Sequence, residues 1–248
     1  MSNQFDFISI DVKQKIYECI FQAIGEDRQA ADSYMDLKTH VSGPFINWDL
    51  IYRNLINAFG DENVKYSTSI RGMWTVLLLY DVKSGFLISF MRDSRLESIR
   101  NSSAESRPQY IRALLNLNEG LQAPLKQRVI PGAESVSDQR CTNLMSVLDD
   151  LCANFECTVD YKKTRHLLVS FSARLGVLNS LNAYILDDNL DIVSEQDWLG
   201  VVNPIISNTI ESAEEHYVPK LTLKPKAQNR LKEKELVTLK DQEDKKQA

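Results

Sequence analysis

The stretch from Met73 to Met91 constrains the fold more than any other part of this sequence. Two strongly apolar runs, MWTVLLLY and FLISFM, flank the turn-like segment DVKSG at residues 81–85. Strands that are buried on both faces of a sheet read as near-continuous hydrophobic runs, and a short turn segment between two of them favours a hairpin. The stretch therefore predicts a β-hairpin in the middle of a sheet, which supplies most of the core.

Apolar residues at helical spacing, bounded by capping residues, predict helices on both sides of this hairpin. A more exposed strand with alternating polar and apolar residues is expected just before it, at about residues 64–70. Segments 26–44 and 120–137 are polar or contain Pro and Gly, and both are typical of loops. The expected helices cover about residues 11–24, 47–59, 108–118 and 144–155, with a last helix after Ser194 or Asn203, and the later strands cover about 157–161, 166–173, 182–186 and 190–193.

This order of elements predicts an α+β protein in which amphipathic helices cover one or two antiparallel sheets. Residues 1–137 form the first expected unit, with a helix, three strands and the long loop, and residues 138–218 form the second. Both units show a helix followed by antiparallel strands, so internal duplication and a single merged domain are open alternatives. Residues 219–248 are rich in Lys, Glu and Gln and are expected to form a charged tail.

Charge is distributed unevenly along the chain. The net charge is −5, yet residues 219–248 hold nine basic and five acidic residues, so this tail carries +4 and the rest carries −9. An acidic body with a basic tail is compatible with an anionic partner, with solubility alone, or with the tail folding against its own body. No apolar run is long enough to span a bilayer, and the first residues lack signal-peptide character. We therefore expect a cytoplasmic protein without membrane contact, whose four cysteines stay free thiols.

The sequence lacks the short motifs of common enzyme classes. It contains no Walker A loop, no dinucleotide-binding fingerprint, no HExxH, no GxSxG and no pair of CxxC motifs. The three histidines are far apart, and Cys152 lies on an apolar helix face, which favours a buried thiol over a zinc ligand. We therefore expect no cofactor and no metal, and the missing motifs favour a non-enzymatic protein while leaving catalysis open.

One catalytic alternative rests on Asp160 and Lys162. An Asp and a Lys two residues apart on a strand point to the same face, an arrangement with which restriction-type nucleases hold a divalent metal and position water. The same spacing recurs at Asp81 and Lys83, where a turn explains it better. His166, beside an apolar run, is a further candidate base, and a structural role is the commoner one for such a histidine. These residues define the alternative of a metal-dependent nuclease or another hydrolase.

The segment between residues 92 and 140 is enriched in arginine. Seven of its eight basic residues are arginine, whereas eight of the nine in the tail are lysine. The planar guanidinium matches phosphate or carboxylate with two parallel hydrogen bonds, which suits anion recognition. Six acidic residues lie in the same segment, so intramolecular ion pairs are the alternative explanation. The candidate binding residues are Arg92, Arg95, Arg100, Arg107, Arg112 and Arg128.

The absence of catalytic motifs, the long loop and the uneven charge favour a non-enzymatic binding or regulatory protein. The expected partner is a macromolecule that contacts the Arg-rich segment and the Lys-rich tail. A protein partner or self-association ranks first, because the acidic body would repel nucleic acid over most of its surface. Nucleic acid ranks second and would contact the basic segments alone.

Overall fold

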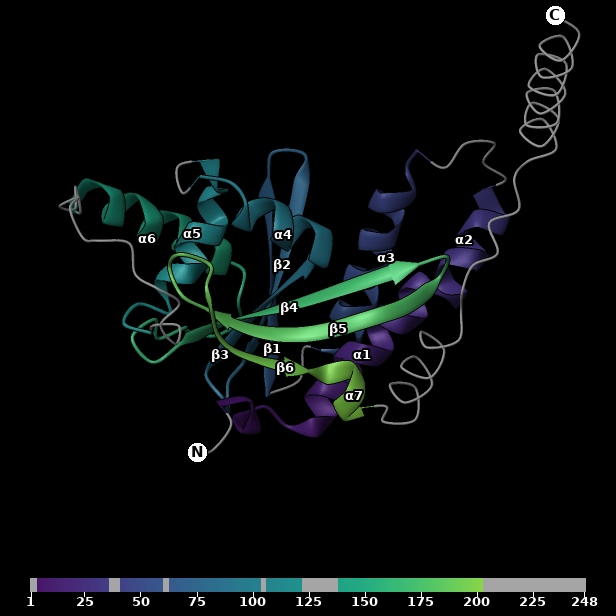
Figure 1. Ribbon diagram of the computed structural model, residues 1–248, viewed down its shortest axis with the longest axis horizontal. Helices are drawn as coiled ribbons and strands as arrows, with labels where there is room; N and C mark the ends of the chain where they lie inside the picture. Colours follow the sequence, from purple (N-terminus) through teal and green to yellow (C-terminus); the bar gives the residue numbers. More distant parts are fainter. Residues whose placement is uncertain (1–3, 36–40, 60–62, 104–105, 122–137, 203–248) are drawn as a thin grey trace, which may run out of the picture. The chain divides into compact units, whose positions relative to one another are not determined.

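Strands β2 (Trp74–Asp81) and β3 (Phe86–Arg92) form the predicted hairpin and lie in the interior of one six-stranded sheet (Figure 1). The computed structural model describes residues 4–35, 41–59, 63–103, 106–121 and 138–202 of the 248-residue chain. The spatial order of the strands equals their order in the sequence. The other strands are β1 (Val64–Arg71), β4 (Arg165–Arg174), β5 (Val177–Leu186) and β6 (Ile192–Asp197).

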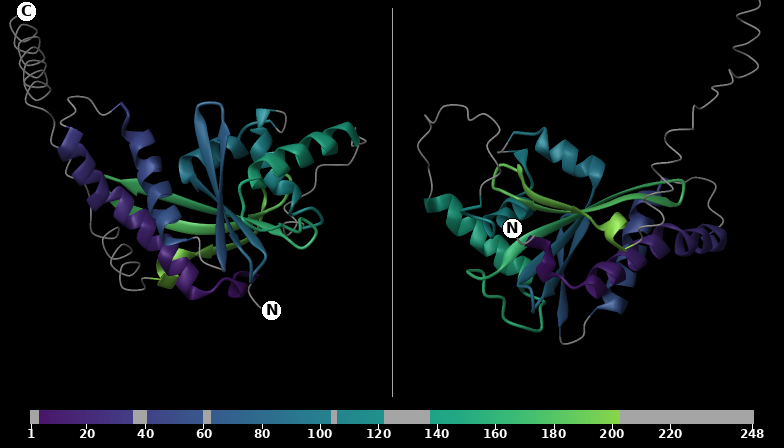
Figure 2. Two further views of the ribbon diagram at one scale, coloured as in Figure 1. Left: turned by 180° about the vertical axis from the view of Figure 1, so that it is seen from behind. Right: turned by 60° about the horizontal axis from the view of Figure 1, so that its bottom comes forward.

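Helices cover both faces of this sheet in two groups, which Figures 1 and 2 show from three sides. One group is α4 (Asp93–Arg100), α5 (Gln109–Asn116) and α6 (Asp138–Cys152). The other is α1 (Ile10–Ile24), α3 (Gly43–Ala58) and α7 (Trp198–Val202), with α2 (Glu26–Met35) beside α1 and α3, and a short 3-10 helix at Gln4–Phe7 precedes them. The prediction of an α+β fold with helix-covered antiparallel strands is confirmed.

The parallel pair β3–β4 joins the two halves of the chain, because each half supplies an antiparallel three-stranded meander. In this pair Ile88 lies beside Leu167 and Phe90 beside Val169, whereas all other neighbouring strands are antiparallel. A parallel connection needs a long crossover, and the segment between β3 and β4 contains α4, α5 and α6. The described parts of both expected units therefore share one sheet.

Alternation along β3 assigns side chains to the two faces. Leu87 packs with side chains of α5 and α6, and Met91 packs with side chains of α4 and α5. Ile88 and Phe90 point to the opposite face, where Phe171 of β4 is fully buried. The hairpin is thus buried on both faces, which is the physical reason for its near-continuous apolar sequence.

Helix α2 was not predicted, because its sequence EDRQAADSYM is polar and buries none of its residues. Side-chain hydrogen bonds tie it to the body instead. Arg28 donates to the Gly43 carbonyl at 2.7 Å and to Asn47 Oδ1 at 2.9 Å, and it pairs with Asp32 at 2.8 Å. Asp27 accepts a bond from Arg53 at 2.7 Å. The prediction of a loop over residues 26–44 is therefore wrong for this helix.

The predicted strand at residues 157–161 is also wrong. This segment runs as an irregular connection from α6 to β4, and Cys157, Val159 and Tyr161 pack against the apolar cluster of α5 and α6. The alternating apolar residues mimicked a strand, but they pack against a cluster formed by α5, α6 and side chains of β2 and β3, and they form no strand pairing. Residues 187–189 form a turn after β5, in which Asp187 Oδ1 accepts from the amides of Asn189 and Asp191 at 2.9 Å.

Several predictions fall outside the described residues: the loop at 122–137, the last helix beyond residue 202 and the tail at 219–248. Within the described ranges, every helix is too short or too polar to cross a lipid bilayer.

Candidate functional site

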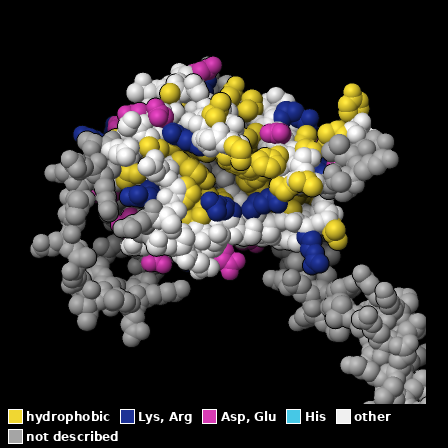
Figure 3. All heavy atoms as spheres, turned by 90° about the horizontal axis from the view of Figure 1, so that it is seen from above, with side chains coloured by type: hydrophobic (Ala, Val, Ile, Leu, Met, Phe, Trp, Pro, Cys, Tyr) yellow, Lys and Arg dark blue, Asp and Glu magenta, His cyan; other side chains and the backbone are white. Residues whose placement is uncertain are grey.

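A cavity of about 730 Å³ lies at one end of the sheet. It is bordered by α3 and α6, by the turn between β1 and β2, by the carboxyl end of β3 and by the first residues of α4 and α5. Figure 3 shows the face toward which this turn points: hydrophobic side chains gather in a hollow, and Lys and Arg side chains lie around them. The volume falls in the range of about 300–1,000 Å³ that is common for ligand sites.

The β1–β2 turn brings an arginine and a tryptophan to the cavity together. Arg71 pairs with Trp74 across a two-residue connection, and Gly72 in that connection has a φ of +66°. Glycine adopts positive φ without the steric cost that a side chain would bring. Directly opposed residues of an antiparallel pair share one face of the sheet, so Arg71 and Trp74 both border the cavity.

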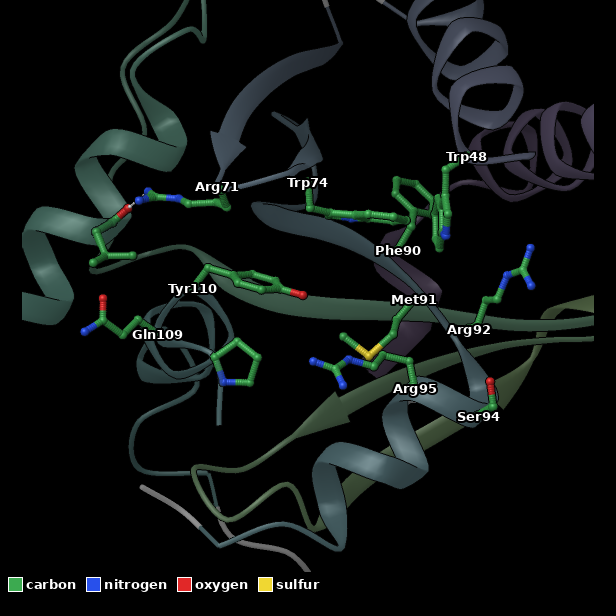
Figure 4. A pocket seen from close by; sticks show the side chains of 13 residues that line it. Trp48, Arg71, Trp74, Phe90, Met91, Arg92, Ser94, Arg95, Gln109 and Tyr110 are labelled. Carbon is green, nitrogen blue, oxygen red and sulfur yellow. Dashed lines mark hydrogen bonds between the residues drawn. The ribbon is translucent and has the colours of Figure 1, made fainter. Parts of the chain in front are cut away.

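Aromatic rings form one wall of the cavity. Trp48 of α3 meets Trp74 edge to face with ring centroids 5.8 Å apart, and it meets Phe171 in the same way at 5.4 Å. Phe90 continues this wall, and Tyr110 of α5 lies across from it (Figure 4). Edge-to-face packing fixes the rings of the cluster against one another, so the wall is preformed.

Three guanidinium groups border the same cavity, from Arg71, Arg92 and Arg95. Arg71 is engaged, because it donates to the Val147 carbonyl at 3.1 Å and lies 3.8 Å from Asp150. Within the described part of the chain, Arg92 and Arg95 make no ion pair, and the buried Nε of Arg92 has no hydrogen-bond partner. Desolvation by burial lowers the pKa of Arg92. A half-buried cation without a carboxylate is a costly arrangement, and an anionic ligand would relieve it.

Asp93 lies between these two arginines in sequence but does not neutralise them. Its carboxylate accepts a hydrogen bond from Ser180 at 2.5 Å and another from Ser170, both on the strands beneath α4. The acid therefore anchors the first turn of α4 to β4 and β5. Arg92 and Arg95, on either side of it in the sequence, both border the cavity.

Tyr110 and Arg95 lie next to each other across the cavity from Trp74 (Figure 4). Burial raises the pKa of the Tyr110 hydroxyl, and the nearby charge of Arg95 acts in the opposite direction. The phenol is therefore neutral at physiological pH and can donate or accept a hydrogen bond. Pro108 caps the start of α5 and so places Tyr110 in the first turn of that helix.

The structure places two of the six predicted binding arginines at the cavity, Arg92 and Arg95. Arg107 instead donates to the carbonyls of Asp188 and Asn189 at 3.2 and 3.1 Å. The other three do not border the cavity as described: Arg100 is exposed on α4, Arg112 is partly buried on α5, and Arg128 lies outside the described residues.

Sequence reasoning missed Arg71, Phe90 and the wall formed by Trp48 and Trp74. The sequence leaves open whether these two tryptophans belong to the core or to an interface. Their convergence depends on the crossing of α3 over the end of the sheet, which has no local sequence signature. Arg71 lies outside the Arg-rich segment and reaches the site through strand pairing.

The catalytic candidates do not converge on this cavity. Asp160 and Lys162 lie in a turn rather than on a strand, with the Lys162 amide donating to Asp160 Oδ1 at 3.2 Å, so the premise of a shared strand face is wrong. The turn at Asp81 is confirmed, since Ser84 donates to its carboxylate at 2.7 Å. Among the described residues, no three His, Cys, Asp or Glu side chains gather as metal ligands would.

His166 is buried in β4, and its Nε2 lies 2.8 Å from the Ser89 hydroxyl on β3. Burial lowers the pKa of His166 to about 3, so the imidazole is neutral in the folded protein at physiological pH. It does not border the cavity. The Asn118 side chain forms two hydrogen bonds with the backbone of His166: it accepts from the His166 amide at 2.9 Å and donates to the His166 carbonyl at 3.0 Å. These contacts belong to the interior of the sheet.

Comparison with known proteins places the chain in a family while leaving its activity open. No curated protein and no solved structure matches it. One family does match, over residues 6–239, which includes both meanders and every described residue of the cavity. The chain belongs to this family, a family of unknown function (DUF5986).

Proposed function

We propose that this protein is a non-enzymatic binding protein that holds an anionic part of a macromolecular partner in the cavity at the end of the sheet. The observation that carries the proposal is the pair Arg92 and Arg95, which border the cavity without an ion pair among the described residues. Their nearest acid in sequence, Asp93, is engaged by serine hydroxyls.

The chemistry of the lining supports an anionic ligand of mixed character. Guanidinium groups form strong, charge-assisted hydrogen bonds with carboxylate or phosphate. The aromatic wall adds apolar area, so a bare inorganic anion would leave most of the site unused. The rest of the chain is acidic in sum, which confines favourable contact with an anion to local surfaces such as this one.

Intrinsic tryptophan fluorescence of the full-length protein tests the proposal. Two of the three tryptophans, Trp48 and Trp74, border the cavity, so an occupant should change their emission. The titrants are a single-stranded oligonucleotide, an acidic peptide and a tyrosine-phosphorylated peptide, with a lysine-rich peptide as the cationic control. We expect saturable binding of at least one anionic titrant and none of the cationic peptide.

The matched variants are the double change Arg92→Gln with Arg95→Gln, and the single change Arg100→Gln. A hydrogen bond to a charged group contributes about 1.5–3 kcal/mol, so the double variant should lose at least about tenfold in affinity. Arg100 is exposed on the same helix outside the cavity and should tolerate the change. Equal losses in both variants, or no binding of any anionic titrant, would refute the proposal.

A further inference from the structure

We propose that the ligand of this cavity is a nucleotide unit of a single-stranded nucleic acid, with its base against the aromatic wall and its neighbouring phosphates on Arg92 and Arg95. The inference rests on the proposed function and narrows it to one class of partner. Three features carry it: the rings, the concave shape, and the two guanidiniums that make no ion pair among the described residues.

The rings are placed as a stacking surface within a hollow. Trp74 presents its face toward the interior of the cavity in the close view, with Tyr110 across from it (Figure 4). Every nucleobase has a π-face, so aromatic side chains bind bases with little dependence on sequence. Trp48 holds Trp74 in place through the edge-to-face contact at 5.8 Å.

Arg92 and Arg95 extend from the junction of β3 and α4, and both border the hollow. Arg95 points toward Tyr110, whereas Arg92 extends away from the rings and also borders a second hollow with Arg28 and Ala173 (Figure 4). Arg92 ends β3, and Arg95 follows in the first turn of α4. A strand whose base enters the cavity carries a phosphate on each side of that base. Two separate cations beside one ring-lined hollow match this pattern, and the planar fork of arginine suits phosphate oxygens.

An acidic peptide uses only half of this site, because Asp and Glu side chains have charge but no aromatic face. A duplex is excluded from the hollow unless a base is flipped out, since its bases are already stacked and paired. An unpaired strand satisfies both the rings and the cations. A tyrosine-phosphorylated peptide is the competing protein ligand, and its binding is an outcome of the test below.

The number of phosphate contacts gives a quantitative expectation. Each phosphate that a protein neutralises on a single strand adds about −0.7 to the slope of log K against log salt concentration. Two contacts predict a slope of about −1.4. Binding through the basic residues of the segment 219–248 would be steeper, at about −6 if all nine took part.

Fluorescence anisotropy with the full-length protein provides the test. The probes are a ten-nucleotide single strand, the same sequence as a duplex, and a ten-unit abasic strand that keeps every phosphate but has no bases. We expect the normal strand to bind at least about tenfold more tightly than the abasic strand, and more tightly than the duplex. Trp74→Leu and Tyr110→Leu should each reduce this ratio, because only the normal strand has bases that can stack on these rings.

The variants preserve apolar bulk, and thermal unfolding checks that each still folds. Because Tyr110 is only partly buried, Tyr110→Leu keeps the test valid if Trp74→Leu unfolds. Equal affinity for the normal and abasic strands would overturn the nucleotide inference and leave the proposed anion binding intact if Arg92→Gln still weakens it. Tighter binding of a phosphotyrosine peptide would likewise overturn the nucleotide inference and leave the proposed anion binding intact. A slope near −6 that is insensitive to the cavity variants, or no anion binding at all, would overturn the nucleotide inference and the proposed function together.

Discussion

The carboxylate of Asp93 accepts a hydrogen bond from the Ser180 hydroxyl at 2.5 Å. Ser172 in turn shares a hydrogen bond with Ser180 at 2.6 Å. These contacts fix the first residue of α4 over the strands β4 and β5. Arg92 and Arg95 flank Asp93 in the chain. The anchored carboxylate of Asp93 therefore fixes the backbone from which both arginine side chains extend.

The change Asp93→Asn therefore separates charge from position. Removing a negative charge next to two arginines would by itself strengthen the binding of an anion. Loss of the anchor should instead displace the start of α4 and weaken binding. We expect a net loss of affinity for the anionic probe, together with a loss of about 1–3 kcal/mol in the free energy of unfolding, measured by urea denaturation and by titration.

Ser180→Ala is the uncharged counterpart of this change. It removes the hydroxyl that donates to Asp93 and leaves the net charge of the protein unaltered. If the anchor positions the arginines, this variant should also bind the anionic probe more weakly. Full affinity in Ser180→Ala, combined with stronger binding in Asp93→Asn, would show that Asp93 acts only through its charge.

Arg92→Met should weaken anion binding without weakening the fold. The guanidinium is half-buried and its Nε lacks a partner among the described residues, so removing it relieves desolvation. We expect the free energy of unfolding to stay constant or to rise by up to about 1 kcal/mol. Arg71→Met is the matched comparison, because Arg71 donates to the Val147 carbonyl and should cost about 1 kcal/mol. Urea denaturation of both variants checks this, and a larger loss in Arg92→Met would contradict it.

The central hairpin was predictable because its signal is local. Residues buried on both faces must all be apolar, and the run from Val76 to Tyr80 reports that burial directly. Helices α1, α3 and α5 were predictable for the same reason, since each has an apolar stripe that faces the core. Helix α2 was not, because hydrogen bonds from Arg28 and Asp27 hold it instead of burial.

The candidate site was only partly predictable. Enrichment in arginine pointed to Arg92 and Arg95, but it also pointed to Arg107, which binds backbone carbonyls in the loop after β5. Nothing in the sequence distinguishes an arginine that caps carbonyls from one that borders a cavity. That distinction depends on which strands pair and on where α4 begins, and both are long-range properties of the fold.

His166 predicts a dependence of stability on acid pH. Its pKa is about 3 in the folded protein and about 6.5 when unfolded, because burial disfavours the charged imidazole. The unfolded chain therefore binds a proton that the folded protein does not as pH falls below about 6.5. This contribution to stability is complete above that pH and should be lost at about 1.4 kcal/mol per pH unit between about pH 6 and pH 4.

The variant His166→Gln should abolish that part of the slope, because glutamine does not titrate. Urea denaturation of both proteins at a series of pH values gives the comparison, and the difference between the two curves isolates His166 from the carboxylates. Parallel curves for the wild type and the variant would show that the buried imidazole is not the titrating group.

Two buried thiols should resist alkylation in the folded protein. Burial raises the pKa of Cys19 and of Cys152 from 9.0 to about 11. The thiolate is the reactive form, so this rise in pKa lowers the thiolate fraction at pH 8 by about a hundredfold.

Cys157 is only partly buried and serves as the internal comparison. We expect iodoacetamide to label Cys157 before Cys19 and Cys152, which should react quickly only after unfolding in urea, as followed by mass spectrometry of tryptic peptides. Equal native labelling of Cys152 and Cys157 would show that α6 opens readily from the α5 side of the core, contrary to the packing described above.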